Sequence, residues 1–510
     1  MSGLAEPLFV FRLRGPVSSS PLLVDIDRDG WPEVFVGGPV LTGLRCYGKV
    51  LDGWPRKARR PFASSPASGD IDGDGRGEIV CGCDDGTIHA FRADATPLRG
   101  WPVRTDADVF STPAIADLDG DKIPEVVVGS DDGSLRVLRG DGSPSWRADI
   151  PLQPFISASP TVSDMNGDGV PEVVVGAWDR RMHMFSAQGR ELPAKMPMAG
   201  NVIWSSATSF EIKGRGRHIA WAADRLYVAS GGGTILPGWP ARTSSWMVSS
   251  PAIAELSPGE GASIIVGAER LCAWDLLGRV RRGWPVDAGD FVWSSPVVAD
   301  IDGDGSREVV VGSWDGGIYA FKSDGSIVQG FPLRTDGPVF STPAIAPLRG
   351  GGGLLVAASW DGSVRGWRLP DAKFIPGDWP QFRGSPERTG NQQTPFDMPM
   401  GPPAIPADSA ARPKIHNVVL EKWAGVRRAV IDGENLEAAR AILMHYQIRG
   451  EGKTHIVPAV NSRGHFVAMF QPLRLPHIIQ YWVEVEDSEG KSQRWPTEGT
   501  KSFVTRRIGH

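Results

Sequence analysis

Residues 291–325 read FVWSSPVVADIDGDGSREVVVGSWDGGIYAFKSDG. An apolar stretch follows Ser-Ser-Pro, four acidic residues crowd into 300–308, and a valine run leads through Trp-Asp-Gly-Gly into an alternating stretch. An Asp-Gly turn between two such stretches is a strong hairpin signal. The segment therefore predicts three short strands, with an acidic loop between the first and the second.

This segment is one copy of a repeat. A Ser/Thr-Pro pair, or its near equivalent, recurs every 44 to 47 residues, and we call its second residue the anchor. The eight anchors are Pro21, Pro66, Pro113, Pro160, Ala207, Pro251, Pro296 and Pro343. Four repeats add a Gly-Trp-Pro segment, which supplies a fourth strand. Four strands repeated every 40–50 residues or so are typical of a propeller blade, so we expect an all-β protein with an eight-bladed β-propeller.

The composition predicts three parts: the propeller at 1–391, a Pro-rich linker at 392–412, and a small β-sandwich at 413–510, where short strand-like runs alternate with turns. Two segments could close the propeller. We expect the N-terminal strand at 8–15 to do so, with 377–384 covering the seam.

Five repeats carry an acidic loop with oxygen-bearing side chains at positions 1, 3, 5 and 9. This spacing lets a tight loop point its oxygens at one hard cation, and Ca²⁺ takes six to eight oxygen ligands. We predict up to five structural calcium ions. The candidate ligands are Asp25, Asp27, Asp29, Glu33; Asp70, Asp72, Asp74, Glu78; Asp117, Asp119, Asp121, Glu125; Asp164, Asn166, Asp168, Glu172; and Asp300, Asp302, Asp304, Glu308.

Position 6 of the loop is glycine in four copies, as a sharp turn requires. The third copy has Lys122, which predicts a weaker or distorted site. The loops after Glu211, Glu255 and Pro347 have lost the aspartates and should hold no metal. Asp and Gly are also ordinary turn residues, but a repeated register of four ligands favours the metal site over a plain turn.

The repeats resemble the FG-GAP/VCBS repeats of β-propellers, the type that forms the head of integrin α chains. They differ from integrin repeats in length and in having Glu at position 9. The C-terminal part resembles fibronectin type III or immunoglobulin-like modules, and DWPQFRGSPERTG at 378–390 is similar to a segment found beside repeats of quinoprotein-like propellers. The resemblance implies adhesion or protein recognition, and an extracellular or cell-surface location.

Aromatic residues recur at two positions whose loops should open on the face opposite the acidic loops. The candidate binding residues are Phe110, Trp204, Trp293 and Phe340, three residues before an anchor, and Trp178, Trp314 and Trp360 in the hairpin turn. Such rings would suit a protein or glycan partner. The alternative is packing between blades, which we prefer for Trp54, Trp101, Trp239 and Trp284 of the Gly-Trp-Pro segments.

No catalytic residues are predicted. His89 and His183 share one repeat position and are interpreted as strand residues, and the four cysteines are interpreted as buried thiols. The alternative is a propeller enzyme, either a polysaccharide lyase or a quinoprotein dehydrogenase. Neither the residues expected of the dehydrogenase nor the insertions expected of the lyase are found.

The most favoured function is recognition, as an adhesion, scaffold or assembly subunit. The net charge of −5 comes with no basic cluster, so no nucleic-acid partner is expected. No apolar run predicts a membrane span, and no secretory signal is predicted at the N-terminus. A cytoplasmic or particle-associated location is therefore the alternative to the cell surface.

Overall fold

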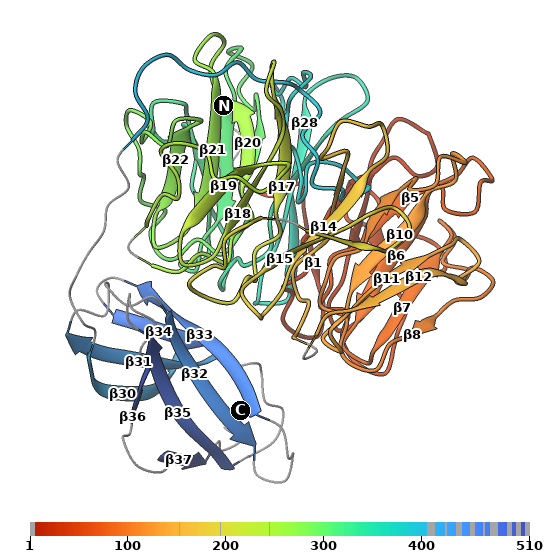
Figure 1. Ribbon diagram of the computed structural model, residues 1–510. Helices are drawn as coiled ribbons and strands as arrows, with labels where there is room; N and C mark the ends of the chain where they lie inside the picture. The colour runs from red at the N-terminus through yellow and green to blue at the C-terminus, as the bar shows by residue number, and fades with distance from the viewer. Residues whose placement is uncertain are drawn as a thin grey trace. The chain divides into compact units, whose positions relative to one another are not determined.

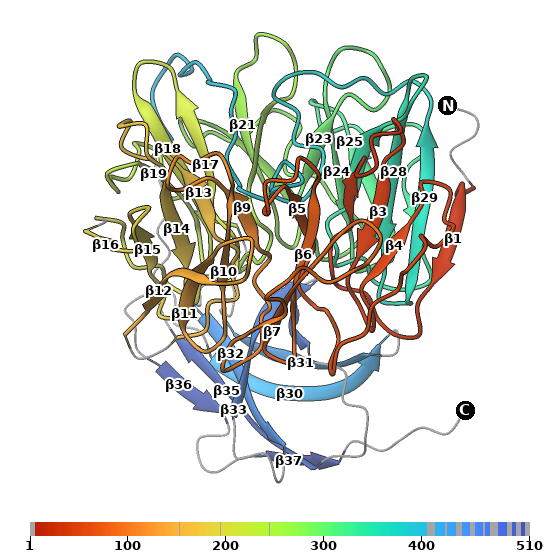
Figure 2. The ribbon, with the colours of Figure 1, turned by 90° about the vertical axis from the view of Figure 1, so that its right-hand side faces the viewer.

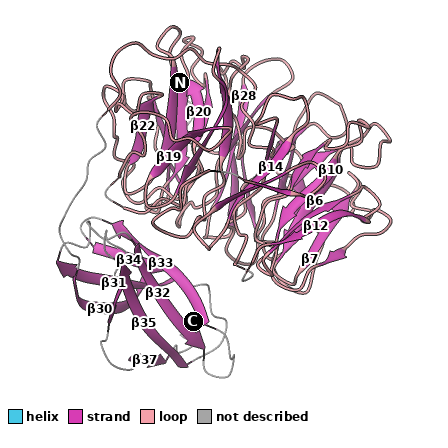
Figure 3. Cartoon of the chain, viewed as in Figure 1, coloured by secondary structure: helices cyan, strands magenta, loops and turns pink. Residues whose placement is uncertain are grey.

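The computed structural model describes residues 6–404, apart from 152, 153, 194 and 244, and the strands of a second unit between 414 and 504. The described residues form strands and turns and contain no helix (Figures 1 and 3). Consequently none of them forms a helix that could cross a membrane. The two units are taken separately below.

The first unit is an eight-bladed β-propeller (Figure 2), as the repeat predicts. Each blade is a small antiparallel sheet whose first strand lies beside the first strands of the neighbouring blades. Blades 1 to 4 consist of β2 (Leu22–Val24), β3 (Glu33–Val36), β4 (Thr42–Leu44); β5 (Ala67–Gly69), β6 (Glu78–Cys83), β7 (Thr87–Phe91), β8 (Val103–Arg104); β9 (Ala114–Ala116), β10 (Glu125–Gly129), β11 (Ser134–Leu138), β12 (Pro144–Asp149); and β13 (Thr161–Ser163), β14 (Glu172–Gly176), β15 (Met182–Phe185), β16 (Glu191–Leu192).

Blades 5 to 8 continue the same order. They consist of β17 (Thr208–Ile212), β18 (Gly216–Ala222), β19 (Leu226–Ser230); β20 (Ala252–Glu255), β21 (Ala262–Gly267), β22 (Leu271–Asp275); β23 (Val297–Ala299), β24 (Glu308–Gly312), β25 (Gly317–Phe321), β26 (Leu333–Arg334); and β27 (Ala344–Pro347), β28 (Gly353–Ala358), β29 (Ser363–Leu369). In blades 1, 5 and 6 the fourth strand is replaced by isolated bridges, of which the outermost join Leu41 with Arg56, Leu226 with Ala241, and Leu271 with Val286.

The N-terminal strand closes the propeller, as predicted. β1 (Phe9–Arg12) pairs antiparallel with β29 and is the outer strand of blade 8. The first and last segments of the ring therefore share one sheet, and the ring cannot open without breaking that pairing.

Apolar cores lie between neighbouring blades. The valine runs of the second strands are fully buried, and the core clusters combine residues of adjacent sheets, as with Val310 of blade 7 and Leu355 of blade 8. The Gly-Trp-Pro tryptophans are nearly buried, and their indole N–H groups donate to a carbonyl of the following blade, for example Trp101 Nε1 to Gly140 O at 2.8 Å. These tryptophans join blades, as the packing interpretation predicts.

A closed ring of eight hydrogen bonds runs around the inside of the propeller. The residue before each anchor donates its backbone N–H to the hydroxyl of the equivalent Ser or Thr in the next blade, at 2.9 to 3.3 Å. The ring residues are Ser20, Ser65, Thr112, Ser159, Ser206, Ser250, Ser295 and Thr342, and each is at most 7% exposed. The Ser/Thr of the repeated motif is therefore a connector between blades.

Residues 379–392 do not merely cover the seam, as we expected from the sequence for 377–384. They pass among the first strands of the blades and hydrogen-bond to all eight; we call this segment the plug (cyan-blue in Figure 2). In every blade its partner is the second residue of the first strand: Leu23, Ser68, Ile115, Val162, Ser209, Ile253, Val298 and Ile345. The first strand of each blade is an edge strand, so one row of its backbone groups has no partner within the blade. The plug supplies partners for these groups.

Two buried arginines hold the plug in place. Arg388, with none of its surface exposed, donates to the carbonyls of Pro21, Pro66 and Phe382. Arg383, 3% exposed, donates to the carbonyls of Pro160 and Ala207, among other acceptors. Burial lowers the pKa of both guanidinium groups. Backbone carbonyls at the anchors therefore replace water around two cations that form no ion pair with a carboxylate among the described residues.

The second unit contains antiparallel strands. They pair in the order β30-β31-β34-β33-β32-β35-β36, with β37 beside β35. Their bounds are β30 (Lys414–Trp423), β31 (Val426–Glu434), β32 (Ala441–Ile448), β33 (Thr454–Ser462), β34 (His465–Met469), β35 (Ile478–Glu486), β36 (Ser492–Trp495) and β37 (Lys501–Val504). The resemblance of this unit to fibronectin type III or immunoglobulin-like modules remains a prediction.

Thr112→Val should destabilise the propeller, because the substitution keeps the shape of the side chain but leaves the buried N–H of Ser65 without an acceptor. We expect a loss of about 1–3 kcal/mol in the free energy of unfolding, measured by denaturant titration. Thr42→Val is the matched control, because the Thr42 hydroxyl is equally buried and has no hydrogen-bond partner. Equal losses in the two variants would contradict the role given to the ring.

Arg388→Met should leave three carbonyls, two of them on buried residues, without their donor and loosen the plug. We expect a loss of about 3 kcal/mol or more in the free energy of unfolding. Arg368→Met removes an exposed arginine of β29 and should change that free energy by about 0.5 kcal/mol or less. A small effect of Arg388→Met would show that the plug contributes little to stability.

Candidate metal loops and recognition face

The five acidic loops share one pattern of hydrogen bonds. In each loop the N–H at position 6 donates to the carboxylate at position 1, and the N–H at position 7 donates to the carboxylate at position 5. In loop 7, Gly305 N lies 3.1 Å from Asp300 Oδ2, and Ser306 N lies 2.8 Å from Asp304 Oδ1. The backbone thus holds the carboxylates at positions 1, 3 and 5 on one side of a tight turn.

Lys122 does not distort the third loop. Its N–H donates to Asp117 Oδ2 at 2.9 Å, as the glycine N–H does in the other loops, and its φ is 73°. A residue with a Cβ can adopt this left-handed conformation at a cost of roughly 1–2 kcal/mol. The third loop is therefore not distorted, because the strain is absorbed by one residue and the carboxylates keep their places. That its site is weaker remains a prediction.

The glutamate at position 9 is buried in every loop. One oxygen accepts the N–H of position 2, for example Glu308 Oε2 from Ile301 N at 2.9 Å. Burial, with the repulsion of the neighbouring aspartates, raises the pKa of Glu33 and Glu78 to about 7 and that of Glu308 to about 8, against the opposing effect of this hydrogen bond. Four acids held together in this way need a counter-charge.

The donor set fits a hard cation. Loops 1, 2, 3 and 7 each bring three carboxylates to within 4.8 Å of one another. Glu308 has none of its surface exposed, and its Oε1 has no hydrogen-bond partner. In loop 4, Asn166 replaces one aspartate and donates its amide to Glu172 Oε1 at 2.8 Å. Oxygen ligands of this kind suit Ca²⁺, which would neutralise the carboxylates and tie the first strand to the second.

Antiparallel pairing places the acidic loops and the candidate aromatic residues on opposite faces of the propeller. The acidic loops join the first and second strands, whereas the aromatic positions lie in the turn between the second and third strands and in the segment before the first strand. The face carrying the aromatic positions is called the aromatic face below.

The candidate aromatic residues gather in two groups on this face. In blades 3 to 5, the Trp204 ring centroid lies 5.1 Å from that of Trp178 and 6.3 Å from that of Phe110. In blades 7 and 8, the ring contacts join Trp293, Trp314, Phe340 and Trp360, with centroids 4.5 to 5.4 Å apart. Trp314 is fully buried and supports the second group from beneath, whereas the other six are half-buried.

Sequence reasoning missed several members of the aromatic face. Phe155 packs on Trp178 at 5.0 Å, and Phe291 packs on Trp314 at 5.6 Å. Asp84 and Asp131 occupy the hairpin position that tryptophan holds in blades 4, 7 and 8. Burial and the nearby Asp108 raise the pKa of Asp84 to about 7. Aligning the turn position in all eight repeats would have found these acids.

The histidines and cysteines have structural surroundings. His183 Nε2 lies 3.0 Å from Asp179, which is four residues earlier in the same hairpin. The residues at the equivalent two positions also pair in other blades, as Arg136 does with Asp132 and Tyr319 with Asp315. Cys83, Asp85 and His89 lie close together in blade 2. Asp85 and His89 occupy the repeat positions that Asp179 and His183 occupy in blade 4. All four cysteines are free and buried, as predicted.

The chain carries FG-GAP-like repeats. The family model described as "FG-GAP-like repeat" matches residues 70–128 and 117–175, which include the acidic loops of blades 2 to 4. No curated protein matches the sequence. The repeat assignment therefore rests on the family model together with the eight-bladed architecture.

Solved propeller structures resemble the chain in fold. BamB from Moraxella catarrhalis has a TM-score of 0.51 at 15% identity, with 71% of this chain and 99% of BamB covered. Sqt1 from Saccharomyces cerevisiae has a TM-score of 0.53 at 14% identity, with 72% of this chain and all of Sqt1 covered. BBS1N, crystallised in complex with ARL6DN, has a TM-score of 0.44 at 13% identity over 69% of this chain and 98% of that one. At such identities the likeness defines the fold alone.

Glu308→Gln should weaken calcium binding at the seventh loop by roughly tenfold or more, because it removes one ligand charge. Without calcium the variant should be at least as stable as the wild type. Burial disfavours the ionised Glu308 carboxylate, as its raised pKa indicates, and the glutamine side chain carries no charge. Calorimetric titration should count one fewer ion. Glu255→Gln, in the loop of blade 6 that lacks the aspartates, is the control, and an equal effect there would contradict the assignment.

Proposed function

We propose that this chain is a calcium-stabilised recognition propeller that binds a protein partner through its aromatic face. The observation that carries the proposal is the plug, which hydrogen-bonds to the first strand of all eight blades. A channel filled by the protein's own backbone leaves the two faces and the rim for function. Of these, the aromatic face offers half-buried Trp and Phe side chains in two groups.

Aromatic rings favour recognition because they bury a large area at a small loss of side-chain entropy. The acids on the same face, Asp84 and Asp131, add a preference for a partner surface that carries Lys or Arg. The calcium ions have a structural role: each would hold the first two strands of its blade together on the opposite face. A glycan partner and a propeller enzyme, such as a polysaccharide lyase, are the competing functions.

The test is capture of a partner from the native source on the immobilised chain, with and without a calcium chelator, followed by titration of the purified partner. Trp204→Ala should weaken binding by about tenfold or more, as expected for an aromatic residue near the centre of an interface. Trp31→Ala is the matched control, because Trp31 is an exposed tryptophan in the first acidic loop.

Equal affinities of the two tryptophan variants would contradict the use of the aromatic face. Turnover of a polysaccharide or an alcohol, with no partner captured, would favour the enzyme. Binding to a glycan array that is lost in Trp204→Ala would support the aromatic face as the binding site, but would show that the partner is a glycan.

A further inference from the structure

Three of the five acidic loops contain a basic side chain from their own blade. Arg45 Nη1 lies 2.6 Å from Asp27 and 2.7 Å from Glu33 in loop 1. In loop 2, Arg92 Nη2 lies 2.6 Å from Asp72. These guanidinium groups contact the oxygens that the calcium proposal assigns to the ion.

The seventh loop has the same arrangement with a lysine. Lys322 Nζ lies 2.8 Å from Asp302 and 2.8 Å from Asp304, the carboxylates at positions 3 and 5. The Oε1 atom of Glu308, which is fully buried, remains without a hydrogen-bond partner. The Lys322 ammonium group therefore pairs with only part of the loop's carboxylates. A metal ion in direct contact with the loop would bind all four.

The basic residues occupy a common place in the repeat, just after the third strand, which ends beside the acidic loop. Arg92, Arg139 and Lys322 each follow their anchor by the same number of residues, and Arg45 lies two residues earlier. The fourth blade has Ser186 at this position. The basic residues that enter loops 1, 2 and 7 therefore all come from the same part of the repeat.

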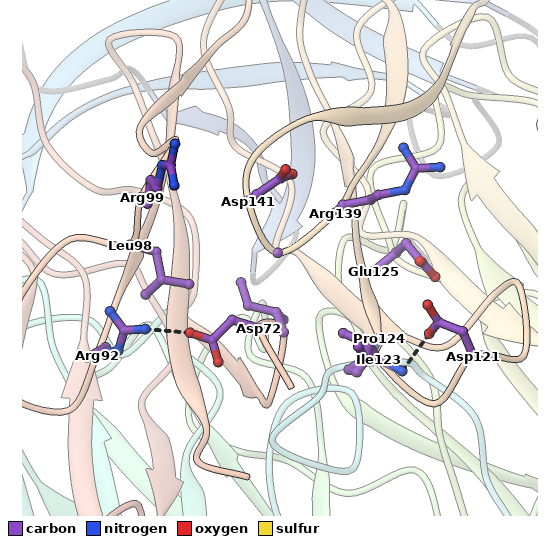
Figure 4. A pocket seen from close by; sticks show the side chains of 12 residues that line it. Asp72, Arg92, Leu98, Arg99, Asp121, Ile123, Pro124, Glu125, Arg139 and Asp141 are labelled. Atoms are coloured by element: carbon purple, nitrogen blue, oxygen red, sulfur yellow. Dashed lines mark hydrogen bonds and ion pairs between the residues drawn. The ribbon is translucent and has the colours of Figure 1, made fainter. Parts of the chain in front are cut away.

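Arg139 of the third blade is the informative exception. Its guanidinium donates to the carbonyl of Pro144 at 3.2 Å and forms no ion pair with the third loop among the described residues. Figure 4 shows Arg92 joined to Asp72 by an ion pair, while Arg139 extends away from Glu125. The chain therefore offers two arginines at equivalent positions, of which only one contacts its acidic loop.

A displaced Arg92 has room to move. Beside it lies a cavity of about 340 Å³ between blades 2 and 3, lined in part by Leu98, Arg99 and Asp141 (Figure 4). The Arg92 side chain is 45% exposed, so turning it away from Asp72 uncovers no buried core. Its departure would cost one ion pair and leave the carboxylates free for a metal ion.

We propose that Arg45, Arg92 and Lys322 are built-in competitors of calcium, which weaken calcium binding at loops 1, 2 and 7 and offset part of the negative charge of these loops when calcium is absent. Loops 3 and 4, without such a residue, fill at lower calcium concentrations. This inference rests on the calcium part of the proposed function. It makes the propeller tolerant of calcium loss at three loops and dependent on calcium at two.

The test compares Arg92→Gln with its matched control, Arg139→Gln, on the full chain. Calcium binding is measured by calorimetric titration, and thermal stability is measured in chelator. Arg92→Gln should tighten one calcium site by about fivefold to tenfold, since removing a competitor removes its coupling to the ion. It should also lower the melting temperature in chelator, where the loop has lost its internal cation. Arg139→Gln should change neither quantity.

Equal calcium affinities in the wild type and both variants would overturn the inference while leaving calcium binding intact. An absence of saturable calcium binding in all three proteins would instead refute the calcium part of the proposed function, and the inference with it. A melting temperature of Arg92→Gln in chelator equal to that of the wild type would also count against the inference, because the arginine would then not offset the charge of the loop.

Discussion

The ring of eight hydrogen bonds between Ser and Thr residues is the constraint on which the rest of the propeller depends. Each of these residues is both a backbone donor to the next blade and a hydroxyl acceptor from the previous one, so one blade cannot shift without breaking two bonds. A buried N–H without an acceptor is costly, so all eight blades must keep the same register. This shared register aligns the second residues of the eight first strands toward the axis, where the plug bonds to them.

The two faces follow from the same register. Because strands alternate in direction, every acidic loop lies on one face and every hairpin turn between second and third strands lies on the other. The positions of the carboxylates are set within each acidic loop, because backbone N–H groups of the same loop donate to them. The aromatic groups also extend across blades, as Trp204 of blade 5 does with Trp178 of blade 4. The carboxylates of one face are therefore held within single repeats, whereas the aromatic groups of the other face need neighbouring repeats as well.

The sequence could predict the features that each repeat contains within itself. The anchors, the acidic loops and the hairpin turns follow from local spacing, and closure by β1 follows from the place of a missing strand. The plug could not be predicted, because its partners are spread over eight strands between Leu23 and Ile345 and its sequence has no matching period. Likewise, Arg92 and Arg139 look equivalent in sequence, and only their contacts tell them apart.

If the plug is an integral part of the propeller, a partner can bind only at the faces or the rim. This can be tested by native-state hydrogen exchange, read by mass spectrometry over residues 379–392 and the first strands. We expect the plug amides to exchange as slowly as those of the first strands and to open with them in one global event. Fast exchange of the plug beside protected first strands would show instead that the channel is open to a ligand.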